Sequence, residues 1–334
     1  MKNLEHILTE LSSISNVTND ADAIQECDDL KTKLKEQQFY VVIVGLFKRG
    51  KSSVINALLG KALAPVAVTP VTAVITAFEY NANDSYANIR FKNGGSAQIP
   101  VSEVAGFISE DENPENKKQV SSVQIFDNSP LLQKLTLVDT PGLGYTFEHN
   151  TDTTLQFIPK IDAGLFVLSA DMPVSKMDTD FLQHITEEIP HIIFVINKTD
   201  LLSKDDLQKI MQHNRKAVSA FLNHASNNIH FIPVSAKLGM EQKKESNIGA
   251  LFNCLDTLAD THKQQLVKLS VYKRAKTLQE YFQAQIQLRL QTLRMPLHEL
   301  EEKQLQMEQS MQLMQQQRTE FDAIIISKIK ALQD

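Results

Sequence analysis

The segment from residue 40 to residue 53 has the residue types and spacing of a phosphate-binding loop. The four residues between its two glycines allow successive backbone N–H groups to surround a phosphate. Lys51 can reach the β- and γ-phosphates, and the Ser52 hydroxyl can ligate Mg²⁺. The apolar residues that follow predict a helix whose N-terminus adds partial positive charge at the same place. The predicted phosphate site comprises Gly45, Lys48, Arg49, Gly50, Lys51, Ser52 and Ser53.

A second motif places an aspartate and a glycine after another apolar strand, predicted at residues 135–138. Asp139 can hold Mg²⁺ through a water molecule, and the Gly142 N–H can contact a γ-phosphate. A threonine between the two motifs is expected to complete the Mg²⁺ shell. We choose Thr72, which directly precedes a strand at 73–80, with Thr69 as the alternative and Thr76 as a strand residue. The predicted metal ligands are Ser52, Thr72 and Asp139.

A third motif, Asn197-Lys198-Thr199-Asp200, ends an apolar strand and predicts which base is bound. The Asp200 carboxylate can accept hydrogen bonds from guanine N1–H and the 2-amino group, which adenine does not offer. Such a site rejects the wrong base because its own polar group would be left unpaired. Lys198 would lie along the base plane, and Asn197 would connect this segment to the phosphate loop. Ser235-Ala236-Lys237 follows the next strand and is expected to complete the pocket, with the Ala236 N–H reading guanine O6.

The composition sets limits on partners and compartment. The 334 residues carry 34 Lys+Arg against 40 Asp+Glu, a net charge of -6, so we expect no nucleic-acid partner. The two cysteines fit a reducing compartment. The sequence shows neither a signal-peptide pattern nor an apolar run long enough to span a membrane. We therefore expect a cytoplasmic chain, which could still lie on a membrane.

The elements that position these motifs follow from apolar periodicity. Residues 4–34 predict two amphipathic helices separated at Asn19-Asp20. Residues 39–240 alternate between strands and helices, as in a doubly wound, mostly parallel α/β sheet. A turn is expected at 93–95 between short strands, and a polar loop at 109–118. The predicted strands are residues 39–44, 73–80, 89–92, 120–126, 135–138, 164–168, 192–196 and 229–234.

Beyond Gly249, glycine disappears and apolar residues repeat in heptads, which predicts long helices. The heptads keep their register across Pro296, which favours one kinked helix over a hairpin folded at that proline. The sequence ends within an apolar stripe, so we expect a piece of a longer protein, with a natural helical C-terminus as the alternative.

These motifs together resemble the GTPase domain of bacterial dynamin-like proteins. The resemblance rests on residues 45–60, on Thr69-Pro70-Val71-Thr72-Ala73-Val74-Ile75-Thr76 and on Asp139-Thr140-Pro141-Gly142, and it covers residues 39 to 250. It implies a P-loop GTPase sheet flanked by an elongated helical bundle. The implied domains are neck helices at 1–37, a GTPase domain at 38–250, and incomplete neck or stalk helices at 251–334.

The resemblance also implies a function: hydrolysis of GTP to GDP with Mg²⁺, stimulated when two GTPase domains dimerise face to face, and used to remodel or bridge membranes. The implied partners are a second copy of the chain or a dynamin-like paralogue, and membrane lipid bound through regions outside this chain. The full-length protein would then lie at the inner face of a membrane. Two alternatives stay open, a translation- or RNA-associated GTPase and a GTP-switched protein scaffold.

The interior of the phosphate loop departs from eukaryotic dynamins, which have Gln-Ser where this chain has Phe47-Lys48. Phe47 cannot position an attacking water. Lys48 matches the position of the arginine finger in the related guanylate-binding proteins, and we expect its ammonium to stabilise charge in the transition state. Arg49 is the competing residue, and both could instead be solvated loop cations. The predicted catalytic residues are Lys48, Arg49, Lys51, Thr72 and Gly142.

Overall fold

The computed structural model of the chain describes residues 2–65, 74–109, 112–139, 161–222, 231–294, 302, 304–315 and 318. The chain divides into two compact units, Met1–Ala275 and Lys276–Asp334, and each is described by itself. The first unit contains the sheet and all three sequence motifs.

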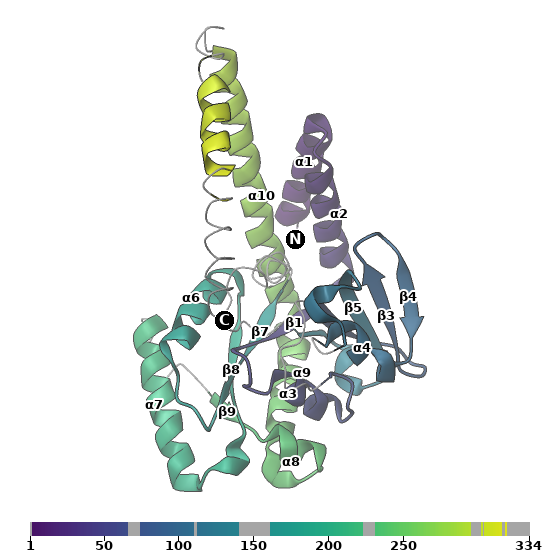
Figure 1. Cartoon of the computed structure of the whole chain (residues 1–334), viewed down its shortest axis with the longest axis vertical. Coiled ribbons are helices and arrows are strands. Elements are labelled where there is room, and N and C mark those ends of the chain that lie inside the picture. The colour runs from purple at the N-terminus through teal and green to yellow at the C-terminus, as the bar shows by residue number, and fades with distance from the viewer. Residues whose placement is uncertain are drawn as a thin grey trace, which may run out of the picture. The chain divides into compact units, whose positions relative to one another are not determined.

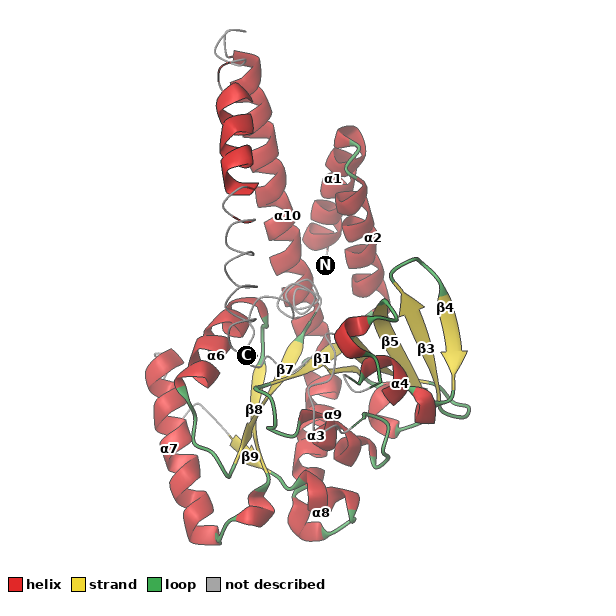
Figure 2. Cartoon of the chain, viewed as in Figure 1, coloured by secondary structure: helices red, strands yellow, loops and turns green. Residues whose placement is uncertain are grey.

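The first unit is organised around a nine-stranded sheet with the order β4-β3-β5-β2-β6-β1-β7-β8-β9 (Figure 2, strands in yellow). β1 lies at the centre and pairs in parallel with β6 and β7, and the parallel arrangement continues through β8 to β9. The strands are β1 Tyr40–Val44, β2 Ile75–Tyr80, β3 Tyr86–Phe91, β4 Ser96–Ile99, β5 Val120–Asp127, β6 Thr136–Asp139, β7 Ala163–Ser169, β8 Ile192–Asn197 and β9 Phe231–Pro233.

The expected mostly parallel α/β sheet is confirmed, and the predicted strands are found within a few residues of their expected bounds. The sequence did not give β4, although the turn at Asn93-Gly94-Gly95 correctly indicated a hairpin there. It also did not reveal that β2 runs antiparallel to β6, or that β3 runs antiparallel to β5. The sheet is therefore mixed on the β4 side and parallel on the β9 side.

Helices cover both faces of the parallel half. Val41, Val42, Ile43 and Val44 of β1 are all fully buried, and successive strand residues point to opposite faces. On one face, α6 contributes Phe181, Leu182 and Ile185 to a cluster with Val42 and Val44. The longer helices of this unit are α1 Lys2–Thr18, α2 Ala21–Glu36, α3 Lys51–Leu59, α6 Lys176–Glu188, α7 Lys204–Leu222 and α9 Ile248–Thr261.

The two N-terminal helices form as predicted. The Asp20 side chain caps α2 by accepting from the Ala23 N–H at 3.1 Å. The second helix therefore begins directly after the polar residues Asn19-Asp20, as the sequence indicated. α10 (Lys263–Arg294) follows α9, and its Arg274 forms an ion pair with Glu26 of α2. The helices that flank the sheet in sequence thus contact each other within the first unit.

A buried polar cluster attaches α2 to the sheet. Asp162, just before β7, is fully buried and pairs with Lys33 of α2 at 2.8 Å. The same carboxylate accepts from the Tyr40 N–H at 2.8 Å and from the Ser270 hydroxyl of α10. Burial raises the pKa of Asp162, and its ion pair with Lys33 opposes that shift. Asp162 thus connects α2, β1 and α10. Separating any of these elements from it would leave a buried charge with fewer partners, which is unfavourable.

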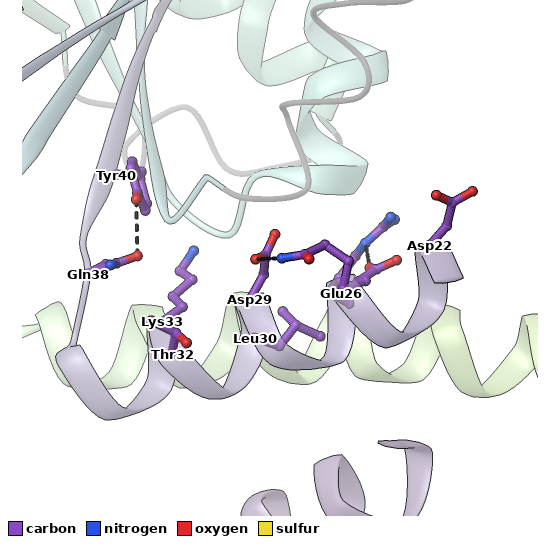
Figure 3. A pocket seen from close by; sticks show the side chains of 10 residues that line it. Asp22, Glu26, Asp29, Leu30, Thr32, Lys33, Gln38 and Tyr40 are labelled. Atoms are coloured by element: carbon purple, nitrogen blue, oxygen red, sulfur yellow. Dashed lines mark hydrogen bonds and ion pairs between the residues drawn. The ribbon is translucent and has the colours of Figure 1, made fainter. Parts of the chain in front are cut away.

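Beside this cluster lies a cavity of about 490 Å³ between α2 and the start of β1 (Figure 3). The Tyr40 hydroxyl, whose pKa burial and nearby carboxylates raise to about 12, donates to Gln38 at 3.1 Å. Tyr40 begins β1, whereas the phosphate loop follows the other end of that strand, so the cavity is separate from the loop. The lining residues are Asp22, Gln25, Glu26, Asp29, Leu30, Thr32, Lys33, Gln38, Tyr40 and Arg274.

The boundary at residue 275 falls within α10, and the second unit also has helical residues at 304–315. Pro296, at which we predicted a kink rather than a hairpin, lies outside the described residues. Most of the last heptads, from residue 319 onward, lie outside them as well. None of the helices in the described part of the chain combines the length and apolar character needed to cross a membrane.

Candidate nucleotide site

The phosphate loop connects β1 to α3 at the carboxyl edge of the sheet (Figure 1). Gly45 has φ 145°, and a Cβ there would lie 2.4 Å from the Val167 carbonyl oxygen of β7. Gly50 has φ 86°, and its Cβ would lie 2.4 Å from the Asn197 side-chain nitrogen. Both glycines are therefore required by close neighbours as well as by backbone conformation. The loop is held against the ends of β7 and β8.

Lys51 is turned into the loop that precedes it. Its Nζ donates to the Gly45 carbonyl at 2.9 Å and to the Leu46 carbonyl at 3.4 Å, and the residue is buried. Burial lowers its pKa, and the Asp139 carboxylate opposes that shift. A buried ammonium that donates to two neutral carbonyls is favourably placed to exchange them for phosphate oxygens. This position agrees with the predicted role of Lys51.

Ser52 and Asp139 meet as the predicted metal ligands should. The Ser52 hydroxyl donates to Asp139 Oδ2 at 2.9 Å, and Asp139 Oδ1 is buried with no hydrogen-bond partner among the residues that the structure describes. An orphaned carboxylate oxygen beside a hydroxyl is an oxygen-donor set of the kind Mg²⁺ prefers when phosphates supply the other ligands. The residues therefore fit the ion. Thr72, Thr69 and Gly142 lie outside the described residues.

The Asp139 carboxyl should make Mg²⁺ binding dependent on pH. Burial raises its pKa to about 6, and Lys51 and the Ser52 hydrogen bond only partly oppose the shift. Because Mg²⁺ needs the ionised form, protonation competes with the metal as the pH falls below this value. Between pH 7 and pH 5 we expect the Mg²⁺ affinity measured with bound GDP to fall by about tenfold beyond the decrease due to the nucleotide itself.

The variant Asp139→Asn supplies the control for this measurement. It cannot titrate at this position, so its Mg²⁺ affinity should be low and should show only the pH dependence of the nucleotide phosphates. Equal pH dependence in the variant and the wild type would show that Asp139 does not hold the metal.

The Asn197-to-Asp200 segment, which we predicted to recognise the base, lies against the phosphate loop. Asn197 is buried, and its side-chain nitrogen donates to the Arg49 carbonyl at 3.2 Å and the Gly50 carbonyl at 3.4 Å. Its side-chain oxygen accepts from the Ala236 N–H at 3.0 Å. That N–H is the group we predicted to read guanine O6, so reading O6 requires it to exchange or share this bond. One asparagine thus connects three segments of the site.

Asp200 is exposed, and the Ser235 hydroxyl donates to one of its carboxylate oxygens. Ser235 also caps α8 (Ala236–Met240) by accepting from the Leu238 N–H. This bond orients the Asp200 carboxylate at the site edge, where a base could reach it. Lys237 is exposed in the same turn, and Ser53 is partly buried in α3. The roles of these residues in nucleotide binding stay predictions.

The two loop cations that we predicted as alternatives differ in placement. Lys48 is exposed, has φ 64°, and its Nζ lies 5.6 Å from the centroid of the Phe47 ring. Arg49 is buried and forms an ion pair with Asp178 of α6 at 2.7 Å. The guanidinium of Arg49 is therefore buried in an ion pair, whereas the Lys48 side chain is exposed to solvent. This difference favours Lys48 as the cation that could reach a transferring phosphate.

Three residues near the loop were not predicted from the sequence, namely Ser169, Asp171 and Asp178. Ser169 ends β7 and Asp171 lies two residues later, so their position after a buried strand was the signal available. Asp178 forms a capping box with Ser175 at the start of α6, a local pattern that indicates a helix start and not a contact with Arg49. That contact depends on tertiary structure.

The fold and the site together define a P-loop nucleotide-binding domain of the GTPase class. Its phosphate loop, its Ser52–Asp139 pair and its Asn197-to-Asp200 segment lie at one edge of a central sheet. Residues 41–200 match the model of the dynamin family. The chain carries a dynamin-family GTPase domain, and the resemblance to bacterial dynamin-like proteins is confirmed.

The chain is similar to bacterial proteins and to a solved bacterial structure over most of its length. A Caldicellulosiruptor protein is 37% identical over 245 residues, covering 73% of this chain and 60% of its own length. Dynamin-like protein 2 of Campylobacter jejuni is 30% identical over 261 residues, covering 75% of this chain and 41% of its own length. A solved structure of an oligomerised bacterial dynamin pair matches with a TM-score of 0.63 at 26% identity, over 81% of this chain and 42% of that one. The chain thus spans 60% or less of the length of each of these proteins.

Proposed function

We propose that this chain hydrolyses GTP to GDP and phosphate with Mg²⁺, and that dimerisation through the GTPase face stimulates turnover. The observation that carries the proposal is the meeting of Lys51, the Ser52–Asp139 pair and Asn197 around one loop of a dynamin-family domain. The family assignment favours this function over the translation- or RNA-associated alternative.

The residues divide the chemistry of phosphoryl transfer among them. Lys51 would exchange its bonds to the Gly45 and Leu46 carbonyls for bonds to phosphate oxygens. Its ammonium would then stabilise the negative charge that develops on those oxygens. Ser52 and Asp139 would hold Mg²⁺, which when bound supplies positive charge to the same oxygens. Asp200 would select guanine. Thr72 and Gly142 are proposed to complete the metal shell and to contact the γ-phosphate.

We propose that the full-length protein couples this hydrolysis to membrane remodelling or bridging. The solved relative is described as an oligomerised dynamin pair that senses and tethers membranes over long range, which supports self-association and a membrane surface as the partner. The contacts from α2 and α10 to Asp162 support a mechanical connection between the sheet and the flanking helices. The lipid-binding parts would lie in regions that this chain does not include.

Dimer-stimulated turnover has a direct test in the dependence of rate on protein concentration. We expect the GTP turnover per molecule to rise as the protein is concentrated, and Lys48→Ala to reduce the stimulated rate by about tenfold or more, because an exposed loop cation is removed from the developing charge. Hydrolysis is followed by phosphate release across a range of protein concentrations.

The matched control is Lys92→Ala, which removes an exposed lysine in the turn after β3 on the other half of the sheet. This variant should behave as the wild type at every concentration. A turnover per molecule that does not change with concentration would contradict dimer stimulation and favour a GTP-switched scaffold. Unchanged stimulation in Lys48→Ala would remove Lys48 from the mechanism.

A further inference from the structure

A continuous series of polar contacts leads from the phosphate loop toward the base-recognition lysine. It starts at Arg49, whose guanidinium donates to Asp178 at 2.7 Å and to the Ser169 hydroxyl at 3.1 Å. The Arg49 and Asp178 side chains are 5% and 1% exposed, so this end of the series is removed from solvent. Ser169 is fully buried at the end of β7. Its hydroxyl is thus fixed by a buried cation that belongs to the phosphate loop.

The series continues from Ser169 to Asp171 and then to Lys198. The Lys198 Nζ donates to Asp171 Oδ2 at 3.0 Å, and the two side chains are 29% and 30% exposed. Burial raises the pKa of Asp171, but a hydrogen bond from Ser169 and the contact with Lys198 outweigh it and hold that pKa below its usual value. The Asp171 carboxylate therefore lies between a hydroxyl fixed from the phosphate side and the ammonium of the base side.

We propose that Asp171 is a positioning residue for guanine recognition. Its carboxylate fixes the Lys198 ammonium, so that the methylene stem of the lysine is ordered before a base arrives. Without that contact, a partly exposed lysine loses rotamer freedom only when the nucleotide binds, which weakens binding. The inference rests on the proposed guanine-nucleotide site and adds to it a residue outside the three sequence motifs.

The backbone at Lys198 supports this role. Lys198 has φ 64°, a conformation that non-glycine residues rarely adopt, so the turn is held by its surroundings. Asn197, its neighbour, is fixed to the carbonyls of Arg49 and Gly50. Asp171 holds the other end of the lysine, at its side-chain nitrogen. The backbone beside this residue is therefore tied to the phosphate loop directly through Asn197, and its ammonium is tied to the loop indirectly through Asp171 and Ser169.

The test compares a ligand that has a base with one that has none. We expect Asp171→Asn to raise the Kd for GDP by about tenfold, because the amide loses the charge that holds Lys198. The Kd for inorganic pyrophosphate should stay within about twofold of wild type, since Lys51 and the loop are unchanged. In the Lys198→Ala background, Asp171→Asn should cause no further loss, because the two residues act through one contact.

Asp84→Asn is the matched control, since Asp84 is an exposed aspartate in the β2–β3 loop, and it should bind both ligands as the wild type does. An unchanged Kd for GDP in Asp171→Asn, an equal loss for pyrophosphate, or additive losses with Lys198→Ala would each overturn the positioning role. The proposed function is tested separately by the wild type. If the wild type prefers GDP to ADP while Asp171→Asn binds normally, only this inference fails, whereas a wild type without that preference overturns both.

Discussion

Replacing Lys51 with alanine should lower kcat/KM for GTP by about a thousandfold, as expected for removal of a preorganised charge from a transferring phosphoryl group. The ammonium is buried, its pKa is lowered by burial, and it donates to the Gly45 and Leu46 carbonyls, which phosphate oxygens can replace. Its loss also removes a cation that opposes protonation of Asp139. Steady-state phosphate release with Mg²⁺ measures the effect.

The conservative variant Lys51→Arg sharpens this prediction. It retains the charge, but a guanidinium is larger and planar, and the buried site between two carbonyls was formed around a compact ammonium. We expect it to restore less than a tenth of the wild-type activity. Activity within threefold of wild type in Lys51→Ala would mean that this loop is not where the phosphoryl group is transferred.

Replacing Asp200 with asparagine should change the base preference of the enzyme. The carboxylate can accept from both guanine N1–H and the 2-amino group, whereas an asparagine amide accepts one bond and donates one. Xanthine offers N1–H together with a 2-oxo group, which matches that amide. We expect kcat/KM for GTP to fall by about 10²- to 10³-fold and that for xanthosine triphosphate to rise above it. Parallel hydrolysis assays with the two nucleotides make the comparison.

The hydrogen bond from Ser235 should keep the substituted side chain in place, because the carbonyl oxygen of asparagine can also accept it. The variant should then change the base preference without disturbing the turn. Asp205→Asn, at the exposed start of α7, is the control and should keep the preference for GTP. If Asp200→Asn lowers the activity with both nucleotides to the same extent, the residue supports the turn and does not select the base.

The parallel half of the fold could be predicted from the sequence because its strands are buried on both faces. The continuous apolar runs at β1, β7 and β8 are typical of such strands, and each is followed by polar residues at the ligand-binding edge. The strand directions of the mixed half could not be predicted. Periodicity shows that β2 is a strand, but its antiparallel pairing with β6 is set by the path of the chain.

The site could be predicted where one motif supplies a complete chemical function, as at Ser52, Asp139 and Asn197. The site could not be predicted where the sequence allows a side chain to be either buried or exposed. The sequence favoured Lys48 and kept Arg49 as the competing residue, and the difference in their burial became visible only through the buried ion pair of Arg49 with Asp178. Asp171 shows the same limit, because nothing in its immediate sequence indicates that Lys198 lies beside it.

One experiment can measure both the base preference and the metal preference of this site. Titration calorimetry of the chain with GDP and with ADP, each with and without Mg²⁺, measures both. We predict that GDP binds at least about a hundredfold more tightly than ADP, since adenine offers Asp200 neither an N1–H nor a 2-amino donor, and that Mg²⁺ strengthens GDP binding through Ser52 and Asp139. Equal affinity for the two nucleotides, or GDP binding that Asp200→Ala does not weaken, would contradict the assignment of this edge of the sheet as a guanine-nucleotide site.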